Sequence, residues 1–114
     1  MEDGHVYVLA LEGGNFYVGW SAAVSGRIAS HFLGAGSKWT MKHKPLTVVS
    51  VQPGSTVLES CVTMALMCKH GWEKVRGGAW TAVDLKKPAC LAKAQHFAQI
   101  RQGNEQAPPA EAQE

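Results

Sequence analysis

The chain contains 114 residues, of which 46% are hydrophobic and 18% are charged, and its formal net charge at pH 7 is +2. This composition is typical of one packed globular domain and excludes a chain that is disordered along most of its length. No run of about eighteen apolar residues occurs, and the acidic, polar residues 1–4 are unlike a secretory signal. We therefore expect no membrane-spanning helix and a cytoplasmic protein, or a nuclear one if it acts in a eukaryotic cell.

The first third of the chain predicts a β-hairpin followed by a helix. Residues 5–11 and 16–20 are rich in strand-forming side chains, and Glu12–Asn15 between them contains the glycines and asparagine that tight turns need. Residues 21–32 repeat apolar side chains at helical spacing. Gly34 can end that helix and begins a loop of small residues.

The middle of the chain predicts a third strand and a second helix. Residues 46–51 form an apolar, β-branched run between Pro45 and Pro53, which is the pattern of a strand bounded by prolines. Ser55 can cap the helix that follows, and Gly71 can end it.

The C-terminal part predicts a turn, a helix and a tail. Residues 75–78 contain two adjacent glycines and favour a turn, and residues 88–101 favour a helix that starts at a proline. Residues 103–114 hold three of the nine acidic residues and no large apolar side chain, so we expect a disordered tail behind a domain of residues 1–102. That domain has an excess of basic residues, which attracts phosphate. The order β-β-α-β-α-α predicts a small α+β fold with a three-stranded antiparallel sheet flanked by helices.

Five side chains offer the groups that phosphodiester hydrolysis requires, namely a proton acceptor, a cation and a carboxylate for a divalent metal. Tyr7 and Tyr17 lie on the two strands of the predicted hairpin, so both phenols can project from one region of the sheet. Arg27 and His31 stand at helical i, i+4 spacing and share a face. Glu59 is an isolated acid at the start of an apolar helix and is a candidate metal ligand.

Each of these residues also has an ordinary structural explanation. Strand tyrosines are usually half-buried packing residues, and an arginine with a histidine on an amphipathic helix is more often a solvated edge. An acid in the first turn of a helix is favoured by the helix dipole alone. The residue types by themselves therefore predict a site for an anionic substrate and nothing narrower.

Several short motifs follow one another in a defined order. They are His5-Val6-Tyr7, Tyr17-Val18-Gly19, Arg27 with His31, Gly34-x-Gly36-Ser37-x-Trp39-Thr40, Lys44-Pro45, Glu59, and the segment Lys69–Trp80 with its Val-Arg-Gly-Gly core. Their order resembles that of the GIY-YIG endonuclease family, and the last segment is similar to one in a viral and phage-like branch of it. The resemblance extends over roughly residues 5–85. His5 stands where the name motif has glycine.

The resemblance implies a metal-dependent DNA endonuclease with the GIY-YIG nuclease fold, which leaves 5′-phosphate and 3′-hydroxyl ends. Its catalytic residues would be Tyr7, Tyr17, Arg27, His31 and Glu59. Glu59 would bind one divalent cation, Mg²⁺ or Mn²⁺, and either tyrosine would act as general base, with His31 as a proton relay. Duplex or branched DNA would be contacted by Lys38, Trp39, Lys42, Lys44 and Arg76, although packing is favoured for Trp39.

Two other functions fit the same sequence. One is a catalytically silent nucleic-acid-binding module, and the other is a virus-encoded interaction or inhibitor protein on the same fold. The preferred DNA substrate, the choice between nicking and double-strand cutting, and the choice between monomer and homodimer stay open.

Overall fold

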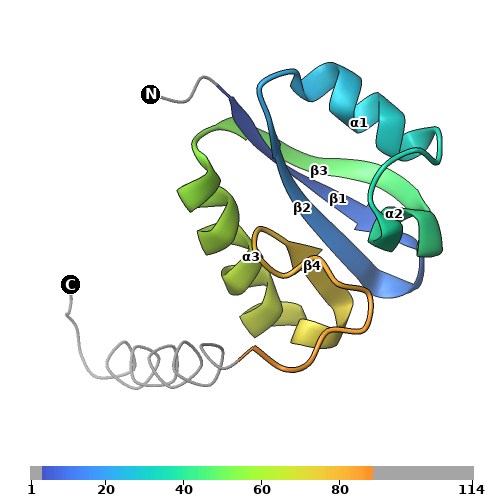
Figure 1. The fold of residues 1–114 in the computed structure, drawn as a ribbon, viewed down its shortest axis with the longest axis vertical. Coiled ribbons are helices and arrows are strands. Elements are labelled where there is room, and N and C mark those ends of the chain that lie inside the picture. Colours follow the sequence, from blue (N-terminus) through green and yellow to red (C-terminus); the bar gives the residue numbers. More distant parts are fainter. Residues whose placement is uncertain (1–3, 89–114) are drawn as a thin grey trace, which may run out of the picture.

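A computed structural model describes residues 4–88, which fold into one sheet with helices on both faces (Figure 1). The strands are β1 (His5–Leu11), β2 (Asn15–Ser21), β3 (Pro45–Pro53) and β4 (Val75–Gly77). The α-helices are α1 (Val24–Phe32), α2 (Lys38–Lys42) and α3 (Thr56–His70), and short 3-10 helices cover Glu12–Gly14 and Trp72–Lys74. The α+β class expected from the sequence is confirmed.

The strands form one mixed sheet in the order β3-β1-β2-β4. β1 pairs antiparallel with β2 and with β3, whereas β2 pairs in parallel with β4. The sequence-based expectation of a three-stranded sheet is therefore wrong, because residues 75–77 form a fourth strand rather than the start of a turn. Parallel neighbours need a long crossover connection, which here contains α1, α2, β3 and α3.

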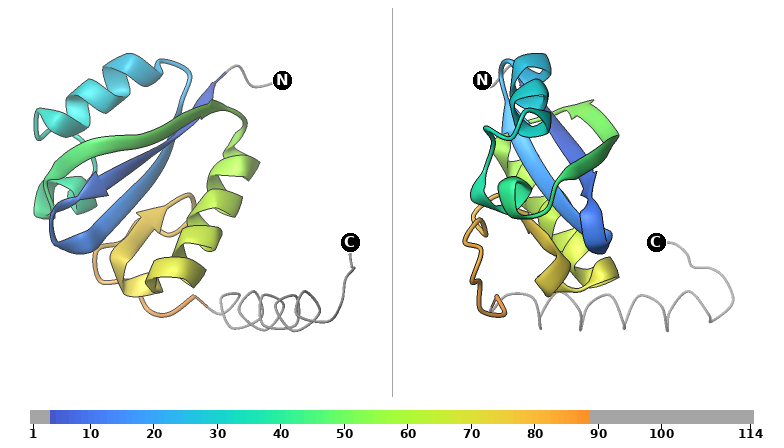
Figure 2. Two further views of the ribbon diagram at one scale, coloured as in Figure 1. Left: turned by 180° about the vertical axis from the view of Figure 1, so that it is seen from behind. Right: turned by 90° about the vertical axis from the view of Figure 1, so that its right-hand side faces the viewer.

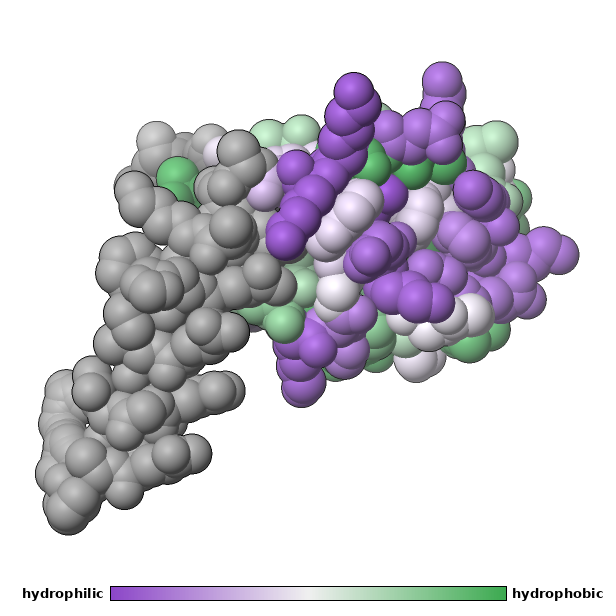
Figure 3. Space-filling model, turned by 90° about the horizontal axis from the view of Figure 1, so that it is seen from below, coloured by the Kyte–Doolittle hydropathy of each residue, from purple (hydrophilic) through white to green (hydrophobic). Residues whose placement is uncertain are grey.

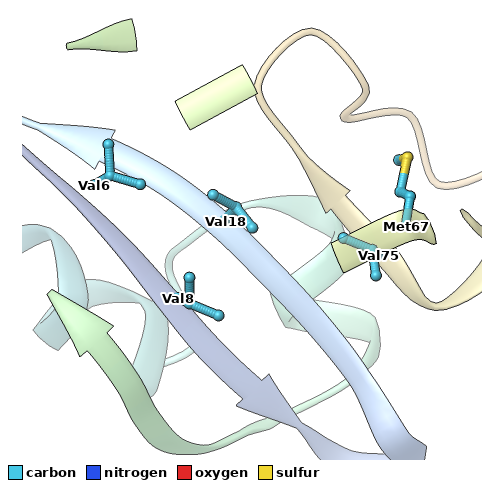
Figure 4. Packing of buried hydrophobic residues seen from close by; sticks show 5 residues of the cluster. All are labelled: Val6, Val8, Val18, Met67 and Val75. Atoms are coloured by element: carbon cyan, nitrogen blue, oxygen red, sulfur yellow. The ribbon is translucent and has the colours of Figure 1, made fainter. Parts of the chain in front are cut away.

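The sheet lies between α3 on one face and α1 with α2 on the other (Figure 2), and each face has its own buried core. On one face, Val6, Val8 and Val18 pack with Val75 and with Met67 of α3, and all five side chains are buried (Figure 4). On the other face, buried residues of β1 and β2 pack with helices α1 and α2. They are Tyr7, Leu9, Leu11 and Tyr17, which pack with the buried Trp39 of α2, with Val24, Ile28 and Val83 at the margin. Both faces of the hairpin are therefore covered, which explains why its sequence is apolar in both alternating registers.

β3 forms one edge of the sheet and is largely exposed. Its register with β1 shifts between Val8 and Leu9 and again between Ala10 and Leu11. Such irregularities interrupt the regular row of backbone groups that an edge strand would otherwise offer to another strand.

Viewed from below, the described part of the surface is mostly hydrophilic, with smaller apolar areas between the polar side chains (Figure 3). Within residues 4–88, no helix is both long enough and apolar enough to cross a membrane.

Local signals predict most of the boundaries correctly. Gly13 and Gly14 adopt a φ of 76° in the hairpin turn, and the Ser55 hydroxyl caps α3 by accepting from the Val57 N–H at 3.2 Å. α1 begins at Val24 rather than Ser21, because Ser21 still pairs with His5 in the sheet.

One helix of the structure is not expected from the sequence, and the expected C-terminal elements lie outside the described residues. The short helix α2 is not expected from the sequence, and it begins where the Ser37 hydroxyl accepts from the Thr40 N–H. The expected helix over residues 88–101, the tail over 103–114 and the domain boundary at 102 lie outside the described residues, apart from Pro88.

Candidate active site

The hairpin register places the two tyrosines on one face of the sheet. Tyr7 lies opposite Gly19 and Tyr17 lies opposite Leu9, so the two phenols stand on diagonal positions with ring centroids 6.2 Å apart. A Cβ atom on Gly19 would overlap the Tyr7 ring. The glycine of the Tyr-Val-Gly motif therefore creates the space in which the Tyr7 phenol lies.

His31 joins the two tyrosines from α1. Its ring is fully buried, and its centroid lies 4.9 Å from that of Tyr17 and 5.6 Å from that of Tyr7. The Tyr7 hydroxyl is hydrogen-bonded to His31 Nε2 at 2.7 Å, and the opposite nitrogen, Nδ1, is 3.0 Å from Thr40 Oγ1. The imidazole is thus held at both nitrogens within the protein.

The loop between α1 and α2 closes over this histidine. Gly34 adopts a φ of 83° directly after the end of α1, a conformation that favours glycine. A Cβ atom on Gly36 would overlap the His31 imidazole. The loop motif therefore needs glycine at its two positions for different reasons. Gly34 adopts a backbone conformation that favours glycine, and Gly36 lies too close to His31 for a side chain.

Arg27 lies one helical turn before His31 and reaches both phenols. Burial raises the pKa of Tyr7 and of Tyr17, and the charge and hydrogen bonding of Arg27 lower it in both cases. Burial, followed by the positive charge of Arg27, lowers the pKa of His31 to about 4. At neutral pH the cluster therefore consists of two protonated phenols, a neutral imidazole and a guanidinium.

Glu59 approaches the same cluster from the opposite side of the sheet. Its charge raises the pKa of Tyr7 and of Tyr17, so the carboxylate lies within electrostatic reach of both phenols. Partial burial raises the pKa of Glu59 itself, and a hydrogen bond from the Gly78 N–H lowers it. The structure therefore gathers all five predicted catalytic residues in one region.

The end of β4 explains how a residue of α3 reaches that region. β4 pairs with β2 only as far as Val18, so its pairing stops one residue short of Gly19 and leaves that edge of the sheet open. Gly77 has a φ of 155°, and a Cβ atom there would overlap the carbonyl oxygen of Val18. The glycine pair after Arg76 thus lets β4 end close to β2 and presents the Gly78 N–H to Glu59.

The donor set limits which metal could bind. Among residues 4–88, no group of three or more His, Cys, Asp and Glu side chains could hold a metal ion. Zinc sites in proteins usually have three or four such ligands, whereas Mg²⁺ is often held by one or two carboxylates, with waters and substrate phosphates as the other ligands. A single carboxylate, Glu59, fits the second arrangement.

The residues expected to contact DNA fall into two groups. Lys38, Lys42 and Lys44 are exposed on α2 and in the segment before β3. Trp39 is only 3% exposed, and its indole N–H donates to the Phe16 carbonyl at 2.9 Å, so the packing role favoured from sequence is the one it has.

Arg76 is also buried, with 3% of its surface exposed. Its guanidinium donates to the carbonyl oxygens of Trp72, Val75, Ala82 and Val83 at 2.7 to 3.0 Å and lies 4.3 Å from the centre of the Trp39 ring. The expected phosphate contact of Arg76 is wrong, because the buried guanidinium makes four hydrogen bonds to backbone carbonyls within the protein. Arg76 instead holds residues 82–83 against β4 and α2.

Thr40 and Ser37 belong to the cluster although no role is predicted for them from the sequence. Thr40 is 1% exposed and contacts His31, and hydrogen bonding from Ser37 lowers the pKa of Tyr17. Their place in the Gly-x-Gly-Ser-x-Trp-Thr motif is the signal that could have identified them, but their contacts depend on α2, which local patterns do not predict.

Comparison with known proteins identifies one short region of similarity. The chain is 39% identical over 44 residues to a protein of Halobacterium salinarum named UPF0213 protein. The matched region covers 39% of this chain and 57% of that relative. No protein-family model matches the chain. No solved structure matches it either.

Proposed function

We propose that the protein is a DNA endonuclease of the GIY-YIG type that depends on a divalent metal and hydrolyses phosphodiester bonds to 5′-phosphate and 3′-hydroxyl ends. The observation that carries the proposal is the convergence of Tyr7, Tyr17, Arg27, His31 and Glu59, which come from two strands and two helices. The cluster combines a proton acceptor, a fixed cation and a carboxylate, the three groups that phosphodiester hydrolysis requires.

Tyr7 is the better candidate for the general base, because only its hydroxyl is hydrogen-bonded to His31, at 2.7 Å. The attacking water gives a proton to Tyr7 Oη while the Tyr7 hydroxyl gives its own proton to His31 Nε2. The neutral imidazole that a pKa of about 4 implies has a free lone pair for that proton. The relay removes the need for a free tyrosinate, which burial of Tyr7 disfavours.

Arg27 and Glu59 act on the phosphate. The permanently charged guanidinium next to both phenols stabilises the negative charge that develops on the phosphate oxygens. Glu59 would hold the divalent cation, and the bound ion would supply Lewis-acid stabilisation of the same charge. Lys38, Lys42 and Lys44 contact the flanking backbone phosphates.

The proposal is tested by incubating the protein with supercoiled plasmid and with a labelled branched duplex, in the presence of Mg²⁺, Mn²⁺ or EDTA. Glu59→Gln, which keeps the size of the side chain, is run beside Glu12→Gln, a matched change at an exposed glutamate. We expect cutting that requires the metal, persists in Glu12→Gln and falls by at least about 10²-fold in Glu59→Gln. Circular dichroism and a thermal melt establish that the variants are folded.

Two results would reject the nuclease. DNA binding without cutting on any substrate would indicate a silent binding module on this fold. Cutting that survives EDTA, or that is unchanged in Glu59→Gln, would point to a contaminating nuclease or to a different site.

A further inference from the structure

We propose that Thr40 is a positioning residue that fixes the tautomer of His31, with the proton on Nδ1, so that Nε2 accepts the hydroxyl proton of Tyr7. Its consequence for catalysis depends on the proposed nuclease function, whereas the tautomer itself does not. The proposal adds to the five expected catalytic residues a buried one that acts through His31.

The first argument concerns the hydrogen bonds that Thr40 makes with Ser37 and His31. Thr40 Oγ1 lies 3.1 Å from the carbonyl oxygen of Ser37 and 3.0 Å from His31 Nδ1. A carbonyl oxygen only accepts, so the contact with Ser37 is a hydrogen bond only when the single hydroxyl proton of Thr40 points to Ser37. Thr40 Oγ1 then accepts from His31, and the proton of the imidazole lies on Nδ1.

The second argument comes independently from the Tyr7 end. Arg27 lowers the pKa of Tyr7 by its charge and by hydrogen bonding to the phenol, and a guanidinium can only donate. The Tyr7 oxygen thus already accepts a hydrogen bond, and the hydroxyl proton needs an acceptor. His31 Nε2, at 2.7 Å, serves as that acceptor only when it carries no proton.

Burial keeps this arrangement in place. His31 and Thr40 are each at most 1% exposed, so bulk water does not compete for the hydrogen bond between them. Thr40 is held by its neighbours, because Ser37 caps α2 and Trp39 is anchored to the Phe16 carbonyl. The direction of the whole chain is therefore Tyr7 to His31 to Thr40 to the backbone of Ser37.

This direction determines what Tyr7 presents to the substrate. With its own proton pointing to His31, the phenol leaves its remaining oxygen lone pair for a water proton on the substrate side. If the proton of the neutral imidazole were on Nε2, His31 would donate to Tyr7, and the phenol could not pass a proton inward. Thr40 thereby sets the direction of the proposed relay.

The assignment is tested by long-range ¹H–¹⁵N correlation spectra of protein labelled with ¹⁵N-histidine, at neutral pH and without DNA. These spectra distinguish the two imidazole tautomers, and His31→Gln identifies the signals of His31. We expect the Nδ1–H form in the wild-type protein, the same form in Thr40→Ser, and a shift toward the Nε2–H form in Thr40→Val. The wild-type spectrum tests the tautomer without any variant.

Cleavage assays supply the second readout. We expect Thr40→Val to lower the cleavage rate by about 10- to 100-fold, which is the loss seen when partners that orient metal-binding histidines are removed. Thr40→Ser, which keeps the hydroxyl, should retain most of the wild-type rate. A wild-type Nε2–H tautomer, or an unchanged tautomer in a folded Thr40→Val variant, would overturn the proposal. A protein with the expected spectra that cuts no DNA would overturn the nuclease function and still support the tautomer assignment.

Discussion

The two faces of the central sheet bury very different side chains. The face toward α3 contains an apolar cluster that includes Val6, Val8, Val18 and Met67. The face toward α1 and α2 buries two phenols, an imidazole, a threonine hydroxyl and a guanidinium beside its aliphatic and aromatic residues. Each polar group on that second face has a hydrogen-bond partner within the protein.

This difference indicates a division of work between the faces. Burial of apolar surface on the α3 side stabilises the fold without demanding particular partners. Buried polar groups contribute little net stability, and loss of one hydrogen-bond partner lowers the free energy of unfolding. We therefore expect such an arrangement where it positions functional side chains. Substitutions on the two faces should therefore separate stability from activity.

The largest expected effect is a loss of activity, caused by a substitution on the face toward α1 and α2, here called the polar face. Tyr7→Phe removes the hydroxyl that links water to His31 in the proposed mechanism and should lower the cleavage rate by on the order of 10²–10⁴. The fold should persist, with a loss of about 1–3 kcal/mol for the unpartnered Nε2. Single-turnover cleavage and urea unfolding measure the two effects. Tyr17→Phe, which does not break the bond to His31, should lose less, and an equal or greater loss would assign the base to Tyr17.

A substitution on the face toward α3, here called the apolar face, should lower stability and leave activity nearly unchanged. Met67 is fully buried, and Met67→Ala should reduce the free energy of unfolding by about 2–5 kcal/mol through lost contacts and a cavity. The cleavage rate per folded molecule should stay near that of the wild type at temperatures below the new midpoint. Met41→Ala is the matched control, because Met41 is 58% exposed and should change stability by less than about 0.5 kcal/mol. A selective loss of cleavage in Met67→Ala would contradict the division between the faces.

The polar face should also respond to acid. The folded-state pKa of His31, about 4, lies below its usual value of 6.5, so the unfolded chain binds the proton first as pH falls. The stability that this histidine contributes is fully present above pH 6.5 and is lost progressively as pH falls from 6.5 toward 4, by at most about 3 kcal/mol.

The measurement is the difference in unfolding free energy between the wild type and His31→Gln across that pH range. The difference should shrink as pH falls, which separates His31 from other groups that titrate in both proteins. His43→Gln is the comparison, because burial also lowers the pKa of His43, so its difference should change with pH in the same direction although its ring lies outside the candidate cluster. A difference that does not change with pH would show that His31 is not held in its neutral form.

The smallest expected effect concerns the exposed lysines near the polar face. Lys42→Gln should reduce the slope of log affinity for duplex DNA against log salt concentration by about 0.9 and leave stability within about 0.5 kcal/mol of the wild type. Fluorescence anisotropy at several salt concentrations measures the slope. Lys69→Gln, an exposed lysine near the end of α3, should leave it unchanged. Equal effects of both changes would indicate diffuse attraction of DNA rather than a defined contact surface.

Patterns within short stretches of sequence were sufficient for the hairpin and for α3. Alternating apolar residues around Gly13 and Gly14 specify two strands and a turn, and the Ser55 cap with Gly71 specifies the ends of a helix. The candidate cluster could be identified from the order of its motifs, and two of these motifs contain a glycine whose absent Cβ makes room for a reactive side chain. Gly19 leaves space for Tyr7 in this way, and Gly36 leaves space for His31.

Tertiary structure alone decided the features that depend on distant partners. Residues 75–77 are a strand only because β2 lies beside them, and Arg76 is buried only because residues 82–83 and Trp39 surround it. Thr40 meets His31 only after α2 has folded against the sheet. The sequence therefore determined the local elements and the residue types of the site, since these follow from backbone propensity and spacing. Contacts between segments far apart in the chain determine which polar groups are buried and in which direction their hydrogen bonds run.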